Sequence, residues 1–268
     1  MAGSDPQVFA TLANATRVWA VGAIHGDIDK LQALHAALAD RLQTGDRLVY
    51  LGNIIGFGPA CVAVINEVLT FRRDFLARRG SFVTDHVILR GAQEEMWRKL
   101  GQLQFAPAPG EALGWMLEHG VDATLASYGV DSRDGLGCCR EGAVSITRWT
   151  SGLGASVRSH AGHEEFFTAI RRAAFTSGGE LLFTAGGIDP DRPVSEQGDS
   201  FWWDMGGFAR IREQWRGYVR LVRGCDAKNH QPEMNEVTAT LDGGAGFGGN
   251  LHAACFTLDG KPADWIQV

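Results

Sequence analysis

The feature that most constrains the fold is a series of short apolar runs, each ending in a glycine-containing turn. The runs are rich in β-branched and aromatic residues, which predicts strands. Because the carboxyl ends of parallel strands share one edge of a sheet, we expect these turns to gather around a single site. In chain order they read GAIHGD (22–27), GNIIGFGP (52–59), RGAQEE (90–95), TAGGIDP (184–190) and RGCD (223–226).

Strands and helices alternate through the first hundred residues. Strands are expected at 17–22, 48–51 and 86–90, and the helices between and after them begin after Asp27, at Pro59 and near Gln93. This order predicts a largely parallel sheet with right-handed crossovers.

The second half of the chain has a different organisation. Residues 163–174 are expected to form a helix, and the remaining strands cluster late. Strands that cluster after an alternating first half predict a second sheet packed on the first. The expected fold is therefore α/β, a four-layer α/β/β/α sandwich of two mixed sheets. The late strands are expected at 180–185, 218–224, 236–241, 251–258 and 263–268.

Periodicity weakens between residues 104 and 160, where a short helix around Trp115 and a polar stretch from Asp131 to Arg140 are the main features. We interpret 104–160 as a small cap or insertion within a single domain that spans residues 1–268. A chain of 268 residues is long enough to bury one large core with such an insertion.

Charge and composition exclude several classes of protein. The net charge of −6 and the lack of a basic stripe argue against partners such as nucleic acid or an anionic membrane. The chain shows neither a leader peptide nor a long apolar run, so a cytoplasmic protein is expected. Five cysteines without a C-x-x-C pair indicate neither a disulfide framework nor a structural zinc site.

The turn series resembles the motifs of the calcineurin-like metallophosphoesterases. The resemblance is strongest to the phosphoprotein-phosphatase branch, which includes serine/threonine phosphatases and diadenosine tetraphosphatases. The family motifs run G-D-x-H-G, G-D-x-x-D-R-G, G-N-H-E, H-A-G and G-H, and all five have counterparts here in the same order. The stretches TLASYGV (124–130) and IDPDRPVSEQGDSFWW (188–203) also match, so the resemblance covers most of the chain.

The resemblance identifies the positions of the family's active-site residues, and at most of these positions this sequence has a different residue. The family holds two metal ions with two Asp, one Asn and three His, and a further His is the general acid. Two adjacent divalent ions need anionic bridging oxygens, which are missing here. Of the seven matching positions only His25 keeps the family's residue. The other six are Ala23 and Asn53 for the two Asp, Ala92 for the Asn, Gln93 for the general acid, and Ala185 and Cys225 for the remaining His.

A second loss concerns phosphate binding. Gly56 and Phe57 stand where the family has an Asp-Arg pair, so the planar guanidinium that would clamp a phosphate is absent from that turn.

The leading hypothesis is a pseudophosphatase that binds a protein partner or a phosphorylated ligand in a regulatory role. Under this hypothesis we expect no cofactor, no bound metal and no catalytic residue. We expect the ligand to be bound by His25, Asn53, Arg90 and Arg223. A small-molecule or nucleotide sensor is a weaker hypothesis that rests on fold analogy alone.

The main alternative to the pseudophosphatase is an active phosphoesterase that uses Mn, Fe or Zn through relocated ligands. Those would be drawn from His25, Asn53, Asp27, Glu94, Asp226 and Cys225, of which His25, Asn53 and Cys225 are the metal candidates.

Three further patterns have simpler interpretations. GAGFGG (244–249) matches a dinucleotide-binding motif but precedes a strand rather than a helix, so we interpret it as a loop that passes close to the site. His160 and His163 are expected at a solvated helix start rather than at a metal. At least half of the aromatic group Phe201, Trp202, Trp203 and Phe208 should be core.

Overall fold

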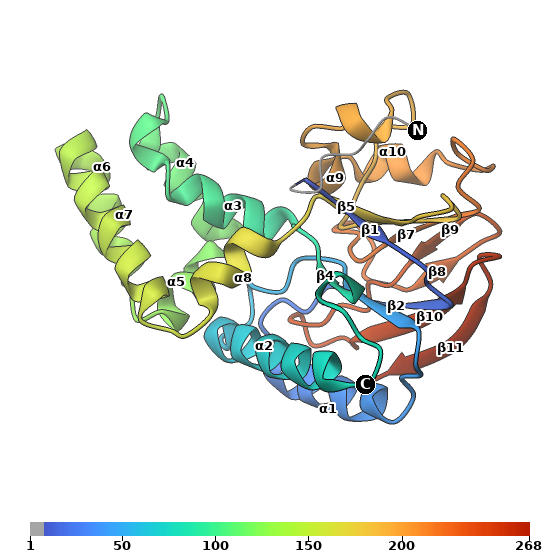
Figure 1. Cartoon of the computed structure of the whole chain (residues 1–268). Coiled ribbons are helices and arrows are strands. Elements are labelled where there is room, and N and C mark those ends of the chain that lie inside the picture. Colours follow the sequence, from blue (N-terminus) through green and yellow to red (C-terminus); the bar gives the residue numbers. More distant parts are fainter. Residues whose placement is uncertain (1–7) are drawn as a thin grey trace.

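The computed structural model describes residues 8–268, and two mixed β-sheets form its centre (Figure 1). In the first sheet β2, β3 and β4 are parallel, and β10 pairs antiparallel with β2. The strands follow the order β11 (Pro262–Gln267), β10 (His252–Thr257), β2 (Arg17–Val21), β3 (Asp46–Tyr50) and β4 (His86–Ile88).

The second sheet has six strands and is also mixed. β6, β7 and β9 are parallel neighbours, β1 pairs parallel with β5, and antiparallel pairs join β5 to β6 and β8 to β9. Its order is β1 (Phe9–Leu12), β5 (Ala173–Thr176), β6 (Leu181–Thr184), β7 (Arg220–Arg223), β9 (Thr238–Thr240) and β8 (Glu233–Met234).

Three buried clusters show that the molecule has four layers. On β2, Val18 and Ala20 belong to the cluster between the two sheets, whereas Trp19 and Val21 belong to the cluster that faces the helices. This alternation is the two-residue period of a strand buried on both faces. Helices α1 (Ile28–Ala39) and α2 (Cys61–Ala77) cover the first sheet, and α9 (Ser200–Trp203) and α10 (Met205–Ala209) cover the second. The expected sandwich is confirmed.

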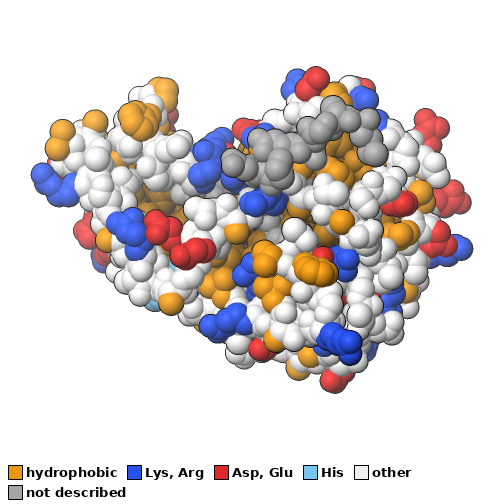
Figure 2. All heavy atoms as spheres, in the orientation of Figure 1, with side chains coloured by type: hydrophobic (Ala, Val, Ile, Leu, Met, Phe, Trp, Pro, Cys, Tyr) orange, Lys and Arg blue, Asp and Glu red, His pale blue; other side chains and the backbone are white. Residues whose placement is uncertain are grey.

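A group of helices projects from one side of the sandwich (Figure 1). We call residues 109–158 the helical lobe; in the space-filling view a notch separates it from the sandwich (Figure 2). It contains α4 (Pro109–Met116), the kinked turn η3 (Leu117–Val121), α5 (Asp122–Ser127), α6 (Ser132–Glu141) and α7 (Ala143–Arg158). Three-residue 3₁₀ turns lie outside it at η1 (Val83–Asp85), η2 (Leu103–Phe105) and η4 (Val194–Glu196).

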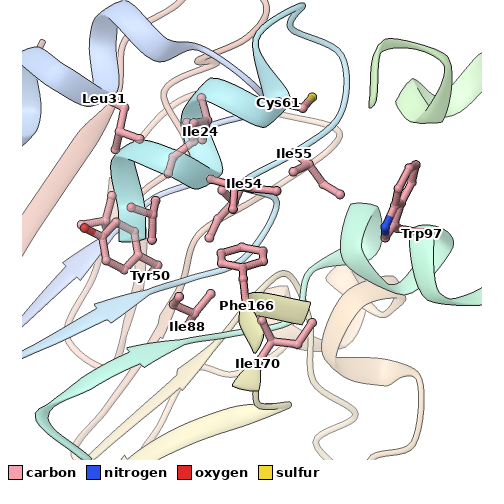
Figure 3. Packing of buried hydrophobic residues seen from close by; sticks show 14 of the residues in the cluster. Ile24, Leu31, Tyr50, Ile54, Ile55, Cys61, Ile88, Trp97, Phe166 and Ile170 are labelled. Atoms are coloured by element: carbon pink, nitrogen blue, oxygen red, sulfur yellow. The ribbon is translucent and has the colours of Figure 1, made fainter. Parts of the chain in front are cut away.

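Two helices connect the lobe to the sandwich: α3 (Ala92–Leu100) precedes the lobe and α8 (His163–Ala169) follows it. Figure 3 shows Phe166 and Ile170 lying near Ile54 and Ile88, at the end of the core that α1 and α2 cover. The boundaries 104–160 of a cap within a single domain stay a prediction.

Some helices and strands do not lie where the sequence patterns predict them. The helix expected over 163–174 ends at Ala169, because β5 follows at Ala173 and pairs with β1, a strand the sequence did not reveal. Helix α2 begins at Cys61 rather than at Pro59. The polar stretch after Asp131 forms α6, with the Asp131 side chain as its N-cap. No helix within residues 8–268 is long and apolar enough to span a membrane; the cytoplasmic location stays a prediction.

Gly120→Ala is expected to lower the free energy of unfolding by about 2–3 kcal/mol. Gly120 has φ +105°, a conformation that costs an L-residue about 1–2 kcal/mol, and an added Cβ would lie 3.0 Å from Phe57 Cδ2. Urea unfolding measures the loss. Gly129→Ala is the control, because Gly129 has φ +73° with open space around its Cβ direction. An equal loss in both variants would contradict a role for the Phe57 contact.

Candidate functional site

The turns that end the strands meet at one edge of the sandwich, as the sequence predicts. The Ala23 amide donates to the Gly224 carbonyl at 3.0 Å, and the Gly224 amide donates to the Ala185 carbonyl at 3.0 Å. These bonds join the ends of β2, β7 and β6 across the two sheets. The His25 amide donates to the Asn53 carbonyl at 2.8 Å, which adds the end of β3.

The backbone of these turns is in an uncommon conformation. His25, Asn53 and Phe57 have φ of +49°, +52° and +60°, and they are three of the five such residues other than glycine in the described part of the chain. Left-handed backbone at side-chain-bearing residues is costly and tends to cluster at functional sites. The turns therefore present these three side chains in a fixed way.

Glu94 holds the second turn in place. Its buried carboxylate accepts backbone N–H bonds from Gly91 at 2.8 Å, Asn53 at 2.9 Å, Ile54 at 2.8 Å and Ile55 at 3.3 Å. Burial raises the pKa of Glu94, and the N–H bonds act in the opposite direction. The amides at the start of α3 and in the 53–55 turn are therefore already occupied by the Glu94 side chain.

His25 is buried between aromatic rings. The ring centroids of Phe57 and Phe247 both lie 5.3 Å from that of His25. Burial lowers the pKa of His25 to about 4, so the imidazole is neutral at pH 7. Within residues 8–268 its Nδ1 has no hydrogen-bond partner.

Asn53 and Gln93 form the adjacent part of the site. Asn53 Oδ1 accepts the Gln93 amide N–H at 3.1 Å, so this oxygen caps α3. Gln93 Nε2 donates to the His119 carbonyl at 2.8 Å, which fixes the orientation of the side-chain amide. Gln93 Oε1 is buried and is left without a partner among the described residues.

Cys225 lies beside a buried carboxylate. Burial, and then the Asp242 carboxylate, raise the pKa of the Cys225 thiol well above its usual value, so it stays protonated. Asp242 accepts N–H bonds from Asp226 at 2.8 Å and Gly244 at 2.9 Å, and it contacts His230 Nδ1 at 3.1 Å.

The two predicted arginine ligands are engaged elsewhere. Arg223 is buried and donates to Thr240 Oγ1 at 2.9 Å and to Asp226 Oδ2 at 2.5 Å, besides two backbone carbonyls. Arg90 donates to Glu95 at 3.2 Å and lies over the Trp202 ring. Their role in ligand binding stays a prediction.

A cleft of about 530 Å³ opens at this edge, and several of its lining residues were not predicted. Trp115 and His119 come from the helical lobe, Trp203 from α9, and Phe247 from the GAGFGG loop, which does pass close to His25. Ala92 lines the cleft, whereas Ala23 and Ala185 are buried in the turns. The remaining lining residues are His25, Asn53, Phe57, Gln93, Met96, Met205, Gly206, Cys225, Ala227, Lys228 and His230.

Two of the simpler patterns can now be assessed. Phe201, Trp202 and Phe208 are buried while Trp203 is 42% exposed, so most of the aromatic group is core as expected. The expectation of a solvated helix start is wrong for His163. It begins α8 but is buried, with Nδ1 2.6 Å from the Tyr128 hydroxyl.

Comparison with known proteins gives a result at the level of the fold. No family model matches the sequence, and no curated protein matches it. Solved structures do. One provisionally assigned as a diadenosine tetraphosphatase matches with TM-score 0.57 and 19% identity over 97% of both chains. A cold-active protein tyrosine phosphatase (TM-score 0.54) and a serine/threonine phosphatase from Saccharomyces cerevisiae (TM-score 0.50) match at 12% identity, each over 97% of this chain and 82% of the other.

The chain has the metallophosphoesterase fold. The fold class implied by the motif series is thus confirmed, and the strand-end edge of this metallophosphoesterase fold is where the motif turns meet.

The metal pair that the family resemblance implies does not fit the residues present. Asn53 Oδ1 is used by a backbone amide, and alanines at three positions supply no donor atom. Over the described residues no group of three or more His, Cys, Asp or Glu side chains is placed to hold a metal ion. The relocated ligands are dispersed: Asp27 caps α1, Glu94 binds the 53–55 turn, and Asp226 pairs with Arg223.

Proposed function

We propose that this protein is a pseudophosphatase, a binding protein that takes a ligand in the strand-end cleft and does not hydrolyse phosphoesters. The proposal rests on one observation. The cleft is present, but the side chains at three of its metal-ligand positions have no atom that could bind a metal ion. The three alanines stand at the strand ends where the family's metal ligands would be. The turns, their left-handed backbone and the cleft of about 530 Å³ are nevertheless present. Hollows of this size suit small organic ligands.

The electrostatics of the cleft support binding rather than hydrolysis. Two adjacent metal ions need anionic ligands between them if they are to bind together and lower the pKa of an attacking water. The carboxylates near the cleft are already committed: Glu94 to backbone amides, and Asp242 to amides and His230. His25 remains as a neutral imidazole between two phenylalanine rings, and a lone His makes a weak metal site.

The experiment is a joint measurement of bound metal and phosphoester turnover on the full chain. Metal content is measured after incubation with Mn²⁺ and desalting. Turnover is measured with p-nitrophenyl phosphate, bis-p-nitrophenyl phosphate and a phosphoserine peptide. We expect no stoichiometric metal and no turnover above that of the His25→Ala variant. Stoichiometric Mn²⁺ together with turnover that His25→Ala abolishes would overturn the proposal in favour of an active enzyme.

A further inference from the structure

We propose that a second cavity, lined by the edge strands of the two sheets, binds a small organic carboxylate through the guanidinium of Arg72. This edge cavity lies apart from the strand-end cleft, because the two share no lining residue among those that the structure describes. The inference concerns a further ligand, and it does not depend on the proposed function of the cleft.

The edge cavity lies where both sheets end. β1 is an edge strand of the six-stranded sheet, and β4 is an edge strand of the five-stranded sheet (Figure 1). Residues 9–11 of β1 and 86–88 of β4 line a cavity of about 300 Å³, together with residues from η1, α2 and the end of α8. This volume is at the lower end of the range for small-molecule sites, so the ligand that fits it is compact.

Arg72 gives this cavity a positive charge that is available to a ligand. The residue lies on α2, is half-buried and lines the cavity. Within residues 8–268 its side chain makes neither a hydrogen bond nor an ion pair. Burial, and then the charge of Arg72, lower the pKa of His86 to about 3, which places that charge near the β4 side of the cavity. A guanidinium without a partner is a strong ligand for a carboxylate, because two N–H groups can bind both oxygens.

The other charges around the cavity do not neutralise Arg72. Neither Asp nor Glu occurs among the described lining residues, whereas a second cation, Arg171, does. The backbone of Arg171 is fixed against β4, because its amide donates to the Ile88 carbonyl at 2.9 Å. The acid that follows the lining residues of η1, Asp85, is buried and pairs with Arg47 at 3.0 Å. The cavity therefore has a positive potential although the chain carries a net charge of −6.

The apolar part of the lining determines the kind of anion. Three buried side chains of the edge strands line the cavity, and Val83, which is 65% exposed, lines it as well. A strongly hydrated ion such as inorganic phosphate gains nothing from contact with this surface. A carboxylate joined to a compact apolar body pairs with Arg72 and buries apolar surface at the same time. The three buried side chains are Phe9, Val87 and Ile88.

The test uses ligands that separate the charge from the apolar body. Benzoate has both, benzyl alcohol has the ring without the charge, and acetate and inorganic phosphate have the charge without the ring. Titration of the full chain, followed by NMR of the backbone amides, should show saturable binding of benzoate with shifts in β1 and β4. Benzyl alcohol should bind at least about tenfold more weakly, because it forms no charge-assisted pair with Arg72. Acetate and phosphate should bind at least about tenfold more weakly, because they bury no comparable apolar surface.

Two neighbouring arginines on α2 provide a matched pair of variants. Arg72→Met removes the charge and keeps an apolar stem, so it should weaken benzoate by about tenfold or more and leave benzyl alcohol unchanged. Arg73 is exposed and is not among the described lining residues, so Arg73→Met should change neither. Ala169→Phe, at an exposed lining position, places a ring in the cavity and should weaken both ligands. Thermal unfolding of each variant confirms that it folds.

Each outcome supports or overturns the inference. Benzoate binding that Arg72→Met weakens and Arg73→Met does not supports it. The inference is overturned if benzoate does not bind, if benzyl alcohol, acetate or phosphate binds as tightly, or if the two arginine variants lose equal affinity. Amide shifts confined to the strand-end cleft would also overturn it. Metal-dependent turnover would instead overturn the proposed function, so the two failures are distinguishable.

Discussion

Glu94→Ala is expected to reduce the free energy of unfolding by at least about 3 kcal/mol. The substitution leaves four backbone donors, on Gly91, Asn53, Ile54 and Ile55, without their shared acceptor in a buried turn. Each unsatisfied buried donor costs about 1–3 kcal/mol, and water entering the vacated space would recover part of that. Urea unfolding at pH 7 measures the difference.

Two further variants test the cause. Glu94→Gln keeps the shape but has one acceptor oxygen and an NH₂ group that faces donors, so an intermediate loss is expected. Glu141→Ala removes an exposed carboxylate at the end of α6 and should change stability by less than about 0.5 kcal/mol. If Glu94→Ala behaved like Glu141→Ala, the carboxylate could not be what holds the turn.

Lowering the pH from 6.5 to 5 is expected to destabilise the protein steeply through its buried histidines. Burial lowers the pKa of His86 to about 3 and that of His25 to about 4. At these two histidines the unfolded chain therefore binds more protons than the folded chain below about pH 6.5. Stability is full above that pH and is lost as pH falls toward the folded pKa values. Each histidine contributes a slope of up to about 1.4 kcal/mol per pH unit.

The slope is measured by urea unfolding at several pH values between 5 and 7. His86 is the informative position, because neither ring nitrogen has a hydrogen-bond partner in the part of the chain that the structure describes. His86→Met should flatten the slope by about 1 kcal/mol per pH unit. Val144→Met, at an exposed residue that has no titratable group, should leave it unchanged. If His86→Met left the slope unchanged, groups other than His86 would control the loss of stability at low pH.

The sequence predicted the features that depend on local pattern. The strand-end turns, the four layers and the gathering of His25, Asn53, Ala185 and Cys225 follow from motifs whose order can be read directly. The pairing of β1 with β5 escaped prediction, because β1 is a four-residue edge strand whose neighbour in the sheet lies far away in the sequence. Tertiary pairing of this kind outweighs local propensity.

The site was only partly predictable for the same reason. Glu94 could be recognised as a motif residue, but three of its four acceptor bonds reach a turn about 40 residues earlier. Trp115 lies in a segment with weak periodicity, and the helix that carries it into the cleft is followed by a kink at Gly120 that the sequence pattern does not reveal. Phe247 left a usable signal, since a phenylalanine inside a run of glycines near the strand ends has few neighbours to pack against.

The contact between Trp115 and Trp203 has a kinetic consequence. One indole belongs to the helical lobe and the other to the helices that cover the second sheet, and they meet edge-on at 65°. A ligand that passes between them must separate the two rings, so its association and dissociation would require the lobe to move relative to α9. Such collective motions fall in the microsecond-to-millisecond range, and relaxation measurements on these two indole signals would report the rate directly.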